Sequence, residues 1–244
     1  MLDPNQERQR SIYAREAVRY DALVSAEDCE GNILRTIEKV TDIEGARVVD
    51  VGGGTGRMAR LLSPRVRGGV VTDREVAMIR AAKRLVAGEG GDRWTLAVGD
   101  ACSLPLRDGV MDIACAGWVF GHFPFWEPSR WVDRVDRALQ EMVRVVRVGG
   151  TLLVLETLGT ATEKAAPPNE GLAAYYERLE TRHGFERIVF RTDYRFSSPS
   201  EAMNLCSFFF GPECAARVRE MGSARIPEHT GLWWKRLKAP DDAP

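Results

Sequence analysis

The stretch that decides the fold of this chain is RVVDVGGGTGRMARLL, residues 47–62. It begins with a β-branched run at 48–51, which is typical of a strand buried on both faces of a sheet. Glycines at 52, 53, 54 and 56 end the strand, and apolar residues resume at helical spacing from Met58. The pattern predicts the strand, glycine turn and helix that open an α/β sheet, in which ligands bind at the carboxyl ends of the strands. Glycines let the backbone approach a ligand closely there, and the helix offers it free N–H groups.

Three kinds of ligand-binding glycine loop compete for this stretch. A phosphate-binding P-loop ends in Gly-Lys-Ser/Thr, whereas Arg57 and Met58 follow Gly56 here. A dinucleotide fingerprint, G-x-G-x-x-G, requires a glycine where Arg57 stands. The pattern present is D-x-G-x-G-x-G, from Asp50 to Gly56. It resembles motif I of the class I S-adenosylmethionine-dependent methyltransferases.

The resemblance continues along the chain to about residue 156. Asp73 ends the next strand, 69–73, about 20 residues beyond the glycine turn, where an acid holds a ribose diol in nucleotide-binding sheets. Gly99-Asp100-Ala101 matches the family's segment beside the adenine. Residues 104–112 (LPLRDGVMD) and 141–150 (EMVRVVRVGG) are similar to the segments before strands four and five.

This resemblance implies a fold, a cofactor and a set of contacts. The fold is a doubly wound, mostly parallel sheet of seven strands, Rossmann-like, with strand order 3-2-1-4-5-7-6 and strand seven antiparallel. The cofactor is S-adenosylmethionine. The residues expected to bind it are Asp50, Gly52, Gly53, Gly54, Thr55, Gly56, Asp73, Arg74, Met78, Asp100, Ala101, Trp118, Tyr13 and Tyr20.

Three of these residues have an alternative interpretation in the core. Residues 5–24 have helical periodicity, and many family members fold a tyrosine of such a leading helix over the cofactor. On propensity alone, Tyr13 and Tyr20, seven positions apart on one side of this helix, favour core packing, which is the alternative. Met78 has the same two readings, beneath the adenine or in ordinary helix packing.

Residues 117–126 (GWVFGHFPFW) follow strand four, at the edge of the sheet where a site belongs. Aromatic rings exclude water, and their faces attract a sulfonium cation. His122 is the candidate catalytic base, because the pKa of an unperturbed imidazole lies near neutrality. A hydrophobic loop without catalytic residues is the alternative.

The remaining candidates are expected to bind the methyl acceptor. Glu156 ends strand five at the same edge of the sheet as Asp73. The alternative is a glutamate whose side chain is exposed to solvent. Strands six and seven are predicted at 185–196 and 230–237. The acceptor-binding residues are predicted to be Phe123, Trp126, Glu156, Tyr194, His229 and Trp233, and Tyr194 and His229 are weaker candidates for the base.

Length and composition limit the classes of function that this chain is expected to have. A chain of 244 residues fits a single methyltransferase domain, with residues 1–44 as a helical cap and 197–229 as a helical insertion between the last two strands. With 34 basic and 35 acidic side chains, no long-range attraction to nucleic acid is expected. Five cysteines without a C-x-x-C pair predict no metal site and a cytoplasmic setting. No apolar run is long enough to span a membrane, so no membrane partner is expected.

These observations predict a methyltransferase that acts on an oxygen, nitrogen or carbon atom of a small molecule. One alternative is an enzyme that methylates RNA or protein. The other is a methyltransferase-fold subunit without catalytic activity that binds a partner. The accepting atom and the oligomeric state stay open.

Overall fold

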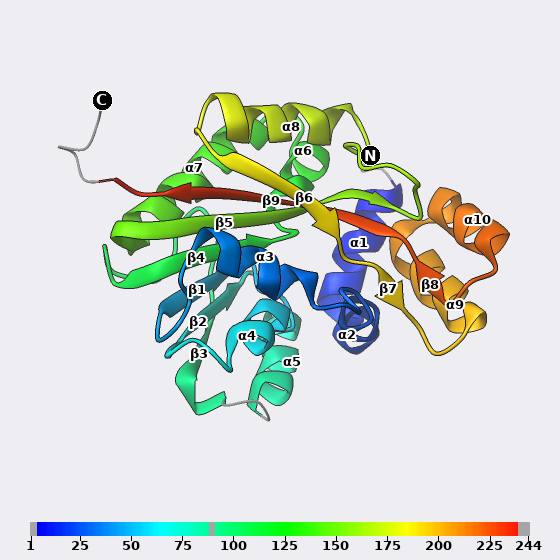
Figure 1. Ribbon diagram of the computed structural model, residues 1–244, viewed down its shortest axis with the longest axis horizontal. Helices are drawn as coiled ribbons and strands as arrows, with labels where there is room; N and C mark the ends of the chain where they lie inside the picture. The colour runs from blue at the N-terminus through cyan, green and yellow to red at the C-terminus, as the bar shows by residue number, and fades with distance from the viewer. Residues whose placement is uncertain (1–3, 88–90, 239–244) are drawn as a thin grey trace.

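A seven-stranded sheet forms the centre of the computed structural model, which describes residues 4–87 and 91–238 (Figure 1). Its strand order is β3-β2-β1-β4-β5-β9-β6, and β9 runs antiparallel to both of its neighbours. The strands are β1 (Arg47–Val51), β2 (Gly68–Asp73), β3 (Trp94–Val98), β4 (Met111–Gly117), β5 (Val146–Thr160), β6 (Glu186–Arg191) and β9 (Glu228–Arg236). The predicted order is confirmed, since β9 is the expected strand seven. Two short strands, β7 (Tyr194–Arg195) and β8 (Arg225–Ile226), form a separate sheet.

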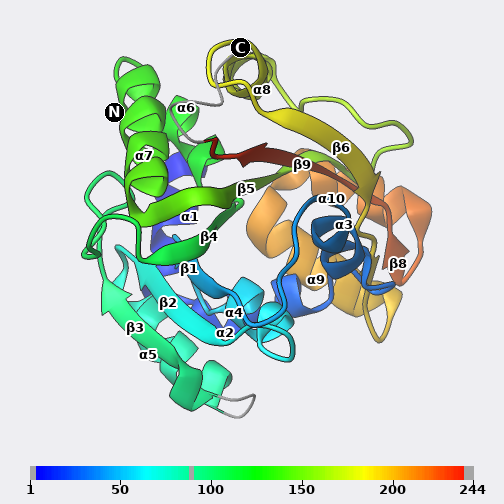
Figure 2. The same ribbon diagram turned by 60° about the vertical axis from the view of Figure 1, so that its left-hand side comes forward.

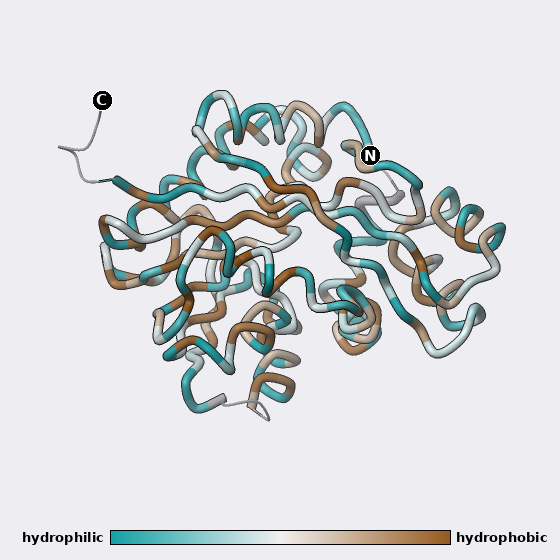
Figure 3. The backbone as a smooth tube through the Cα atoms, viewed as in Figure 1, coloured by the Kyte–Doolittle hydropathy of each residue, from teal (hydrophilic) through white to brown (hydrophobic). Residues whose placement is uncertain are grey.

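Helices cover both faces of the large sheet, because alternate residues of its strands point in opposite directions (Figure 2). Val48 of β1 packs with the helices of one face, and Val49 and Val51 pack with those of the other. The first group comprises α3 (Asn32–Val40), α4 (Arg57–Leu62) and α5 (Val76–Val86). The second comprises α6 (Phe123–Trp126), α7 (Trp131–Val145) and α8 (Glu170–Thr181). Figure 3 shows the hydrophobic segments concentrated along the central strands between these layers.

Four further helices gather beyond the carboxyl ends of the parallel strands (Figure 1). These end helices are α1 (Pro4–Arg15), α2 (Ala17–Ser25), α9 (Pro199–Phe210) and α10 (Pro212–Met221). Leu23 of α2 is fully buried in one hydrophobic cluster with Leu205 and Val218. The first two helices and the two helices between β7 and β8 therefore meet at the same edge of the sheet.

Two expected elements are interrupted in the structure. The helix expected at 5–24 is two helices, because Glu16 adopts a non-helical backbone (φ −118°, ψ 29°). The strand expected at 185–196 leaves the large sheet after Arg191, and Tyr194 pairs with Ile226 instead. Both interruptions change the direction of the chain where it reaches the end helices. Local periodicity does not predict such changes of direction.

Two short 3-10 turns, η2 (Gly91–Arg93) and η3 (Phe120–His122), complete the described elements. Within those residues, no helix has both the length and the apolar composition needed to cross a bilayer.

Candidate functional site

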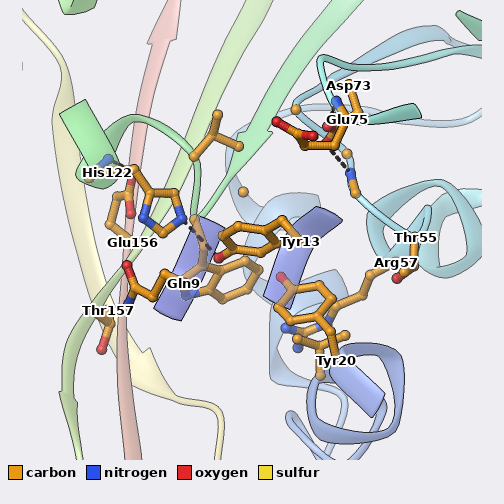
Figure 4. Close-up of a pocket in the computed structure, with 18 of the residues that line it drawn as sticks. Gln9, Tyr13, Tyr20, Thr55, Arg57, Asp73, Glu75, His122, Glu156 and Thr157 are labelled. Atoms are coloured by element: carbon orange, nitrogen blue, oxygen red, sulfur yellow. Dashed lines mark hydrogen bonds between the residues drawn. The ribbon is translucent and has the colours of Figure 1, made fainter. Parts of the chain in front are cut away.

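A cavity of about 260 Å³ lies between the carboxyl ends of the strands and the end helices (Figure 4). Most of the predicted site residues line it. They are Tyr13, Tyr20, Asp50, Gly52, Gly53, Gly54, Thr55, Asp73, Arg74, Asp100, Ala101, Trp118, His122, Phe123, Trp126, Glu156 and Tyr194. The site therefore combines the glycine turn, the aromatic loop after β4 and the leading helix.

The glycine turn allows the chain to pass close to its neighbours. Gly52 and Gly54 have positive φ values of 64° and 56°, which residues with a side chain rarely adopt. A Cβ atom on Gly53 would lie 2.5 Å from Oδ2 of Asp50. Gly56 lies outside the cavity: it precedes α4 in the left-handed conformation, and a Cβ there would lie 2.5 Å from Val86. The lack of a side chain at Gly56 therefore allows α4 to pack closely on α5.

Asp73 is fixed at the end of β2 by two backbone groups. Its Oδ2 accepts a hydrogen bond of 2.9 Å from the N–H of Gly54, and its Oδ1 accepts one of 2.8 Å from the N–H of Glu75. Burial raises the pKa of this carboxyl, although both N–H donors oppose the shift. Each carboxylate oxygen has two lone pairs, so an oriented acceptor remains for two hydroxyl groups.

Asp50 is buried behind the glycine turn. Neither of its carboxyl oxygens accepts a hydrogen bond of normal geometry within residues 4–87 and 91–238, although the N–H of Ala59 is near enough to lower its pKa. Burial raises the pKa of this group to about 7. A buried acceptor without a well-aligned donor is costly, so a ligand that donates a hydrogen bond fits here.

Asp100 lies on the other side of the turn, after β3. Its two oxygens accept hydrogen bonds of 3.2 and 3.1 Å from Nη2 of Arg134. Burial alone would raise the pKa of Asp100, but the hydrogen bonds from the N–H of Cys102 and from Arg134 outweigh burial and lower it. Asp100 is therefore an ionised, anchored carboxylate at the cavity rim.

The loop after β4 is ordered around Trp118 and His122. Trp118 has a φ of 56°, its N–H donates to the carbonyl of Leu155, and the guanidinium of Arg57 lies 4.6 Å above its ring. His122 stacks on Trp126 with 4.4 Å between ring centroids. Burial lowers the pKa of His122 to about 4, so its imidazole is neutral near pH 7.

Glu156 is buried rather than solvated, which excludes the alternative interpretation of this residue. Its side chain lines the cavity from the carboxyl-terminal part of β5. Oε1 accepts hydrogen bonds from the N–H of Gly121 at 2.9 Å and from the hydroxyl of Tyr175 at 3.4 Å. Burial raises the pKa of Glu156 to about 8, despite these donors.

The two tyrosines of the leading helices pack on each other at the cavity. Tyr13 and Tyr20 pack edge to face, with ring centroids 5.2 Å apart, and both line the cavity. Figure 4 shows Tyr13 beside His122 and Tyr20 beside Arg57. The rings are thus packed on each other and face the same space.

Three other predicted residues lie away from the cavity. Met78 is buried with Ala17 and Ala81, as in its alternative reading as a packing residue. His229 is buried in β9 opposite Arg191. Trp233 points to the α8 face, where its indole N–H donates to Glu180. Alternation along β9 and helix packing, rather than ligand contact, decide these orientations.

Sequence reasoning did not identify several lining residues, namely Gln9, Glu27, Arg57, Thr157, Phe209, Phe210 and Glu228. Arg57 directly follows the glycine motif, and this position in the sequence was the signal that could have identified it. Glu27 and Glu228 belong to no motif, so their place in the cavity follows only from the tertiary fold. No cluster of His, Cys, Asp or Glu suited to a metal ion occurs within the described parts of the chain.

Comparisons with known proteins give one family. Residues 49–154 match the family model described as a methyltransferase domain. A malonyl-[acyl-carrier protein] O-methyltransferase of Geobacter sulfurreducens is 32% identical over 157 residues, 64% of this chain and 54% of that protein. A ubiquinone/menaquinone biosynthesis C-methyltransferase of Paracoccus denitrificans is 33% identical over 153 residues, 59% of this chain and 57% of that protein. The chain spans about half the length of these curated relatives.

Solved structures with the same fold have lower identity. The [4+2]-cyclase SpnF has a TM-score of 0.62 at 18% identity, and the match covers 98% of both chains. A phosphoethanolamine N-methyltransferase 2 of Haemonchus contortus, in complex with S-adenosyl-L-methionine, has a TM-score of 0.59 at 14% identity. This match covers 95% of the present chain and 60% of the other. At such identities the likeness concerns the fold alone.

Proposed function

We propose that the chain is a member of the class I S-adenosylmethionine-dependent methyltransferase family and that it transfers a methyl group from S-adenosylmethionine to a small-molecule acceptor. The observation that carries the proposal is the link between Asp73 and the glycine turn. The N–H of Gly54 holds the Asp73 carboxylate at the end of β2, inside the cavity. An oriented acid beside glycines of positive φ suits a ribose diol and a closely approaching ligand.

The residues present fit the cofactor along the whole glycine turn. Asp73 would hold the ribose hydroxyls, and Asp100 and Ala101 would border the adenine. The buried carboxyl of Asp50 would accept a hydrogen bond from the amino-acid part. When bound, S-adenosylmethionine supplies an electrophilic methyl group on a sulfonium. The aromatic residues Tyr13, Tyr20 and Trp118 would surround that cation and exclude water from it.

A small acceptor suits the cavity better than RNA or protein. Aromatic rings enclose the space beside His122. The ring centroid of Tyr13 lies 6.0 Å from that of Trp126 and 6.1 Å from that of Phe209. The formal net charge of −1 gives no long-range attraction to a nucleic acid. The two relatives are an O- and a C-methyltransferase by name, in accord with a neutral or weakly acidic accepting atom.

We further propose that Glu156 removes the proton of the acceptor and that His122 orients it. A general base is most efficient when its pKa lies near the working pH. The pKa of about 8 of Glu156 meets that condition better than the pKa of about 4 of His122. A sulfonium in the cavity would favour the ionised form of Glu156 further. In-line alignment of donor and acceptor contributes about 7–11 kcal/mol of barrier reduction in well-oriented reactions.

Calorimetry and labelled methyl transfer test this function. The protein is expected to bind S-adenosylmethionine and S-adenosylhomocysteine, whereas Gly54→Val, which forces a β-branched residue to a φ of 56°, binds neither. With S-adenosylmethionine labelled in its methyl group and a cell extract, label is expected in the low-molecular-weight fraction. Label in RNA or protein instead would establish the corresponding alternative. Cofactor binding without any transfer would support the non-catalytic subunit.

A further inference from the structure

A second group of polar residues lines the cavity without belonging to the cofactor motifs. We call it the acidic wall; it consists of Glu27, Thr157, Tyr194 and Glu228. The four residues come from the loop after α2, from β5, from β7 and from the first position of β9. Figure 4 shows Thr157 next to Glu156, on the side of the close-up opposite Asp73. The wall therefore adjoins the proposed base.

Within this wall, Glu27 is fully engaged by protein donors. Its Oε2 accepts a hydrogen bond of 2.7 Å from Nη1 of Arg57 and one of 3.1 Å from the hydroxyl of Tyr194. Its Oε1 accepts a hydrogen bond of 3.0 Å from the hydroxyl of Thr192. Glu27 contributes negative charge to the wall and has its donors already in place.

Glu228 differs because the side chains bonded to its carboxyl are neutral hydroxyls and not a cation. Its Oε1 accepts a hydrogen bond of 2.6 Å from the hydroxyl of Thr157. Its Oε2 makes no hydrogen bond of normal geometry among the residues described, although the hydroxyl of Thr160 is near enough to lower the pKa of the carboxyl. Glu228 is only 1% exposed and lines the cavity. The main chain at Glu228 is fixed, since its N–H donates to Asp193 and its carbonyl accepts from Thr192. Burial, followed by the charge of Glu27, raises the pKa of Glu228 to about 8.

The charges along the cavity leave Glu228 without a cation. Three arginines line the described part of the cavity, and each is paired with another carboxylate. Arg57 binds Glu27, Arg74 binds Glu75, and Arg134 binds Asp100. With its raised pKa, Glu228 is protonated near pH 7 unless a cation comes close, and the guanidinium of Arg57 is already bound to Glu27. A neutral hydroxyl would give Glu228 only a hydrogen bond. A protonated amine supplies the charge that ionises Glu228 and donates a hydrogen bond to the resulting carboxylate.

We infer that the acceptor carries a protonated amine and that this ammonium binds the carboxylate of Glu228. The inference rests on the proposed methyl transfer and specifies the acceptor of that same site. A protonated amine has no lone pair with which to attack a methyl group, so this amine is an anchor. The accepting atom is a different atom of the same molecule, placed beside Glu156, because Glu156 and Glu228 line the same cavity. Glu228 thus determines which acceptors bind, and Glu156 acts on the bound molecule.

Two probes of the same shape test the assignment. 2-Phenylethylamine and 2-phenylethanol differ only in the ammonium and hydroxyl groups, and calorimetry would measure their binding to the protein saturated with S-adenosylhomocysteine. We expect the wild type to bind the amine roughly ten- to a hundredfold more tightly than the alcohol, as a charged hydrogen bond provides. In Glu228→Gln the two affinities should become nearly equal. Glu186→Gln, at an exposed position of β6, is the matched control and should keep the preference.

The possible outcomes distinguish a failure of this inference from a failure of the proposed methyl transfer on which it rests. If the wild type binds both probes equally, or neither with saturation, the amine anchor is overturned. If Glu228→Gln binds S-adenosylmethionine more weakly than the wild type, Glu228 belongs to the cofactor and the assignment to the acceptor fails. If the wild type does not bind S-adenosylmethionine at all, the proposed function itself fails. Should Glu228→Gln not fold, carboxyl ¹³C NMR of the wild type replaces it: the amine, and not the alcohol, should ionise a glutamate carboxyl.

Discussion

The hydroxyl of Tyr13 lies 3.0 Å from Nε2 of His122, so the first helix of the chain is hydrogen-bonded to the loop after the fourth strand. On its other side His122 stacks on Trp126. The imidazole is therefore held between two aromatic residues and already has a partner for one ring nitrogen. This arrangement suits an orienting residue, and it leaves proton transfer to Glu156, whose carboxyl lines the same cavity.

Amide substitutions should separate these two roles. Glu156→Gln is expected to lower kcat about 10²–10⁴-fold, because the amide keeps the shape of the side chain but cannot accept a proton. His122→Gln should raise the KM for the acceptor and change kcat less than about tenfold. Steady-state release of S-adenosylhomocysteine measures both. The opposite pattern, with kcat lost only in His122→Gln, would return the base role to His122.

The pH dependence of the reaction provides a second test of the base. If the ionised Glu156 is required, kcat/KM should rise with pH and level off above about 8, the pKa of this carboxyl. A base with the pKa of about 4 of His122 would already be unprotonated, giving a flat profile near neutrality. Kinetics across this range at fixed ionic strength distinguish the two. Glu156→Gln should flatten whatever activity remains.

Removal of the charge of Asp73 should weaken cofactor binding. We expect Asp73→Asn to lose roughly 1–3 kcal/mol of affinity for S-adenosylmethionine, since the ribose hydroxyls would lose a charged acceptor. The amide has the size of the carboxylate, so the turn at Gly54 is least disturbed. Calorimetry of this variant is compared with that of Asp92→Asn, at an exposed position in η2. Equal affinity in a folded Asp73→Asn would remove Asp73 from the binding site.

The buried pair of Arg57 and Glu27 should contribute to stability. Their side chains are 15% and 3% exposed, with 2.7 Å between Nη1 and Oε2. Arg57→Met leaves the Glu27 carboxylate buried without its cation, and should lower the free energy of unfolding by about 3 kcal/mol. Arg65→Met removes a surface pair with Glu44 and should cost at most about 1 kcal/mol. Urea unfolding measures both; similar losses would contradict the special role of the buried pair.

Stability should fall as the pH rises from about 6.5 to 8. The pKa values of Asp50, Glu156 and Glu228 are raised to about 7, 8 and 8 by burial. Such carboxyls hold protons in the folded state that the unfolded chain has released. Their contribution is therefore complete below the unfolded pKa of about 4 and is lost as the pH passes the folded values. His122, with its lowered pKa, acts in the opposite direction, but only below about 6.5.

The same range of pH tests the contribution of Glu228. Urea unfolding at successive pH values should give a smaller slope for Glu228→Gln than for the wild type, by up to about 1.4 kcal/mol per pH unit for one proton. Glu186→Gln should keep the slope of the wild type, because its side chain is exposed. A stability that increases between about 6.5 and 8 would show that these carboxyls are ionised in the folded protein.

The sheet and its first turn were predictable because their signals are local. A β-branched run followed by glycines and an amphipathic helix already specifies β1, the turn and α4, and the spacing to Asp73 specifies the end of β2. The strand order followed from the family resemblance and is confirmed. The breaks at Glu16 and after Arg191 were not predictable, because contacts with distant segments at the end helices determine them.

The sequence by itself therefore determined the sheet, the glycine turn and the acids at the strand ends, since each depends on neighbours within a few residues. Only the tertiary structure decided which residues form the acidic wall of the cavity. Tyr194 reaches Glu27 across 167 positions of sequence, and Glu228 faces the same cavity from the start of β9. It also turned Met78, His229 and Trp233 away from the cavity. Burial, which sets the pKa values of Glu156, Glu228 and His122, depends on every element that closes the cavity, and no stretch of sequence encodes it alone.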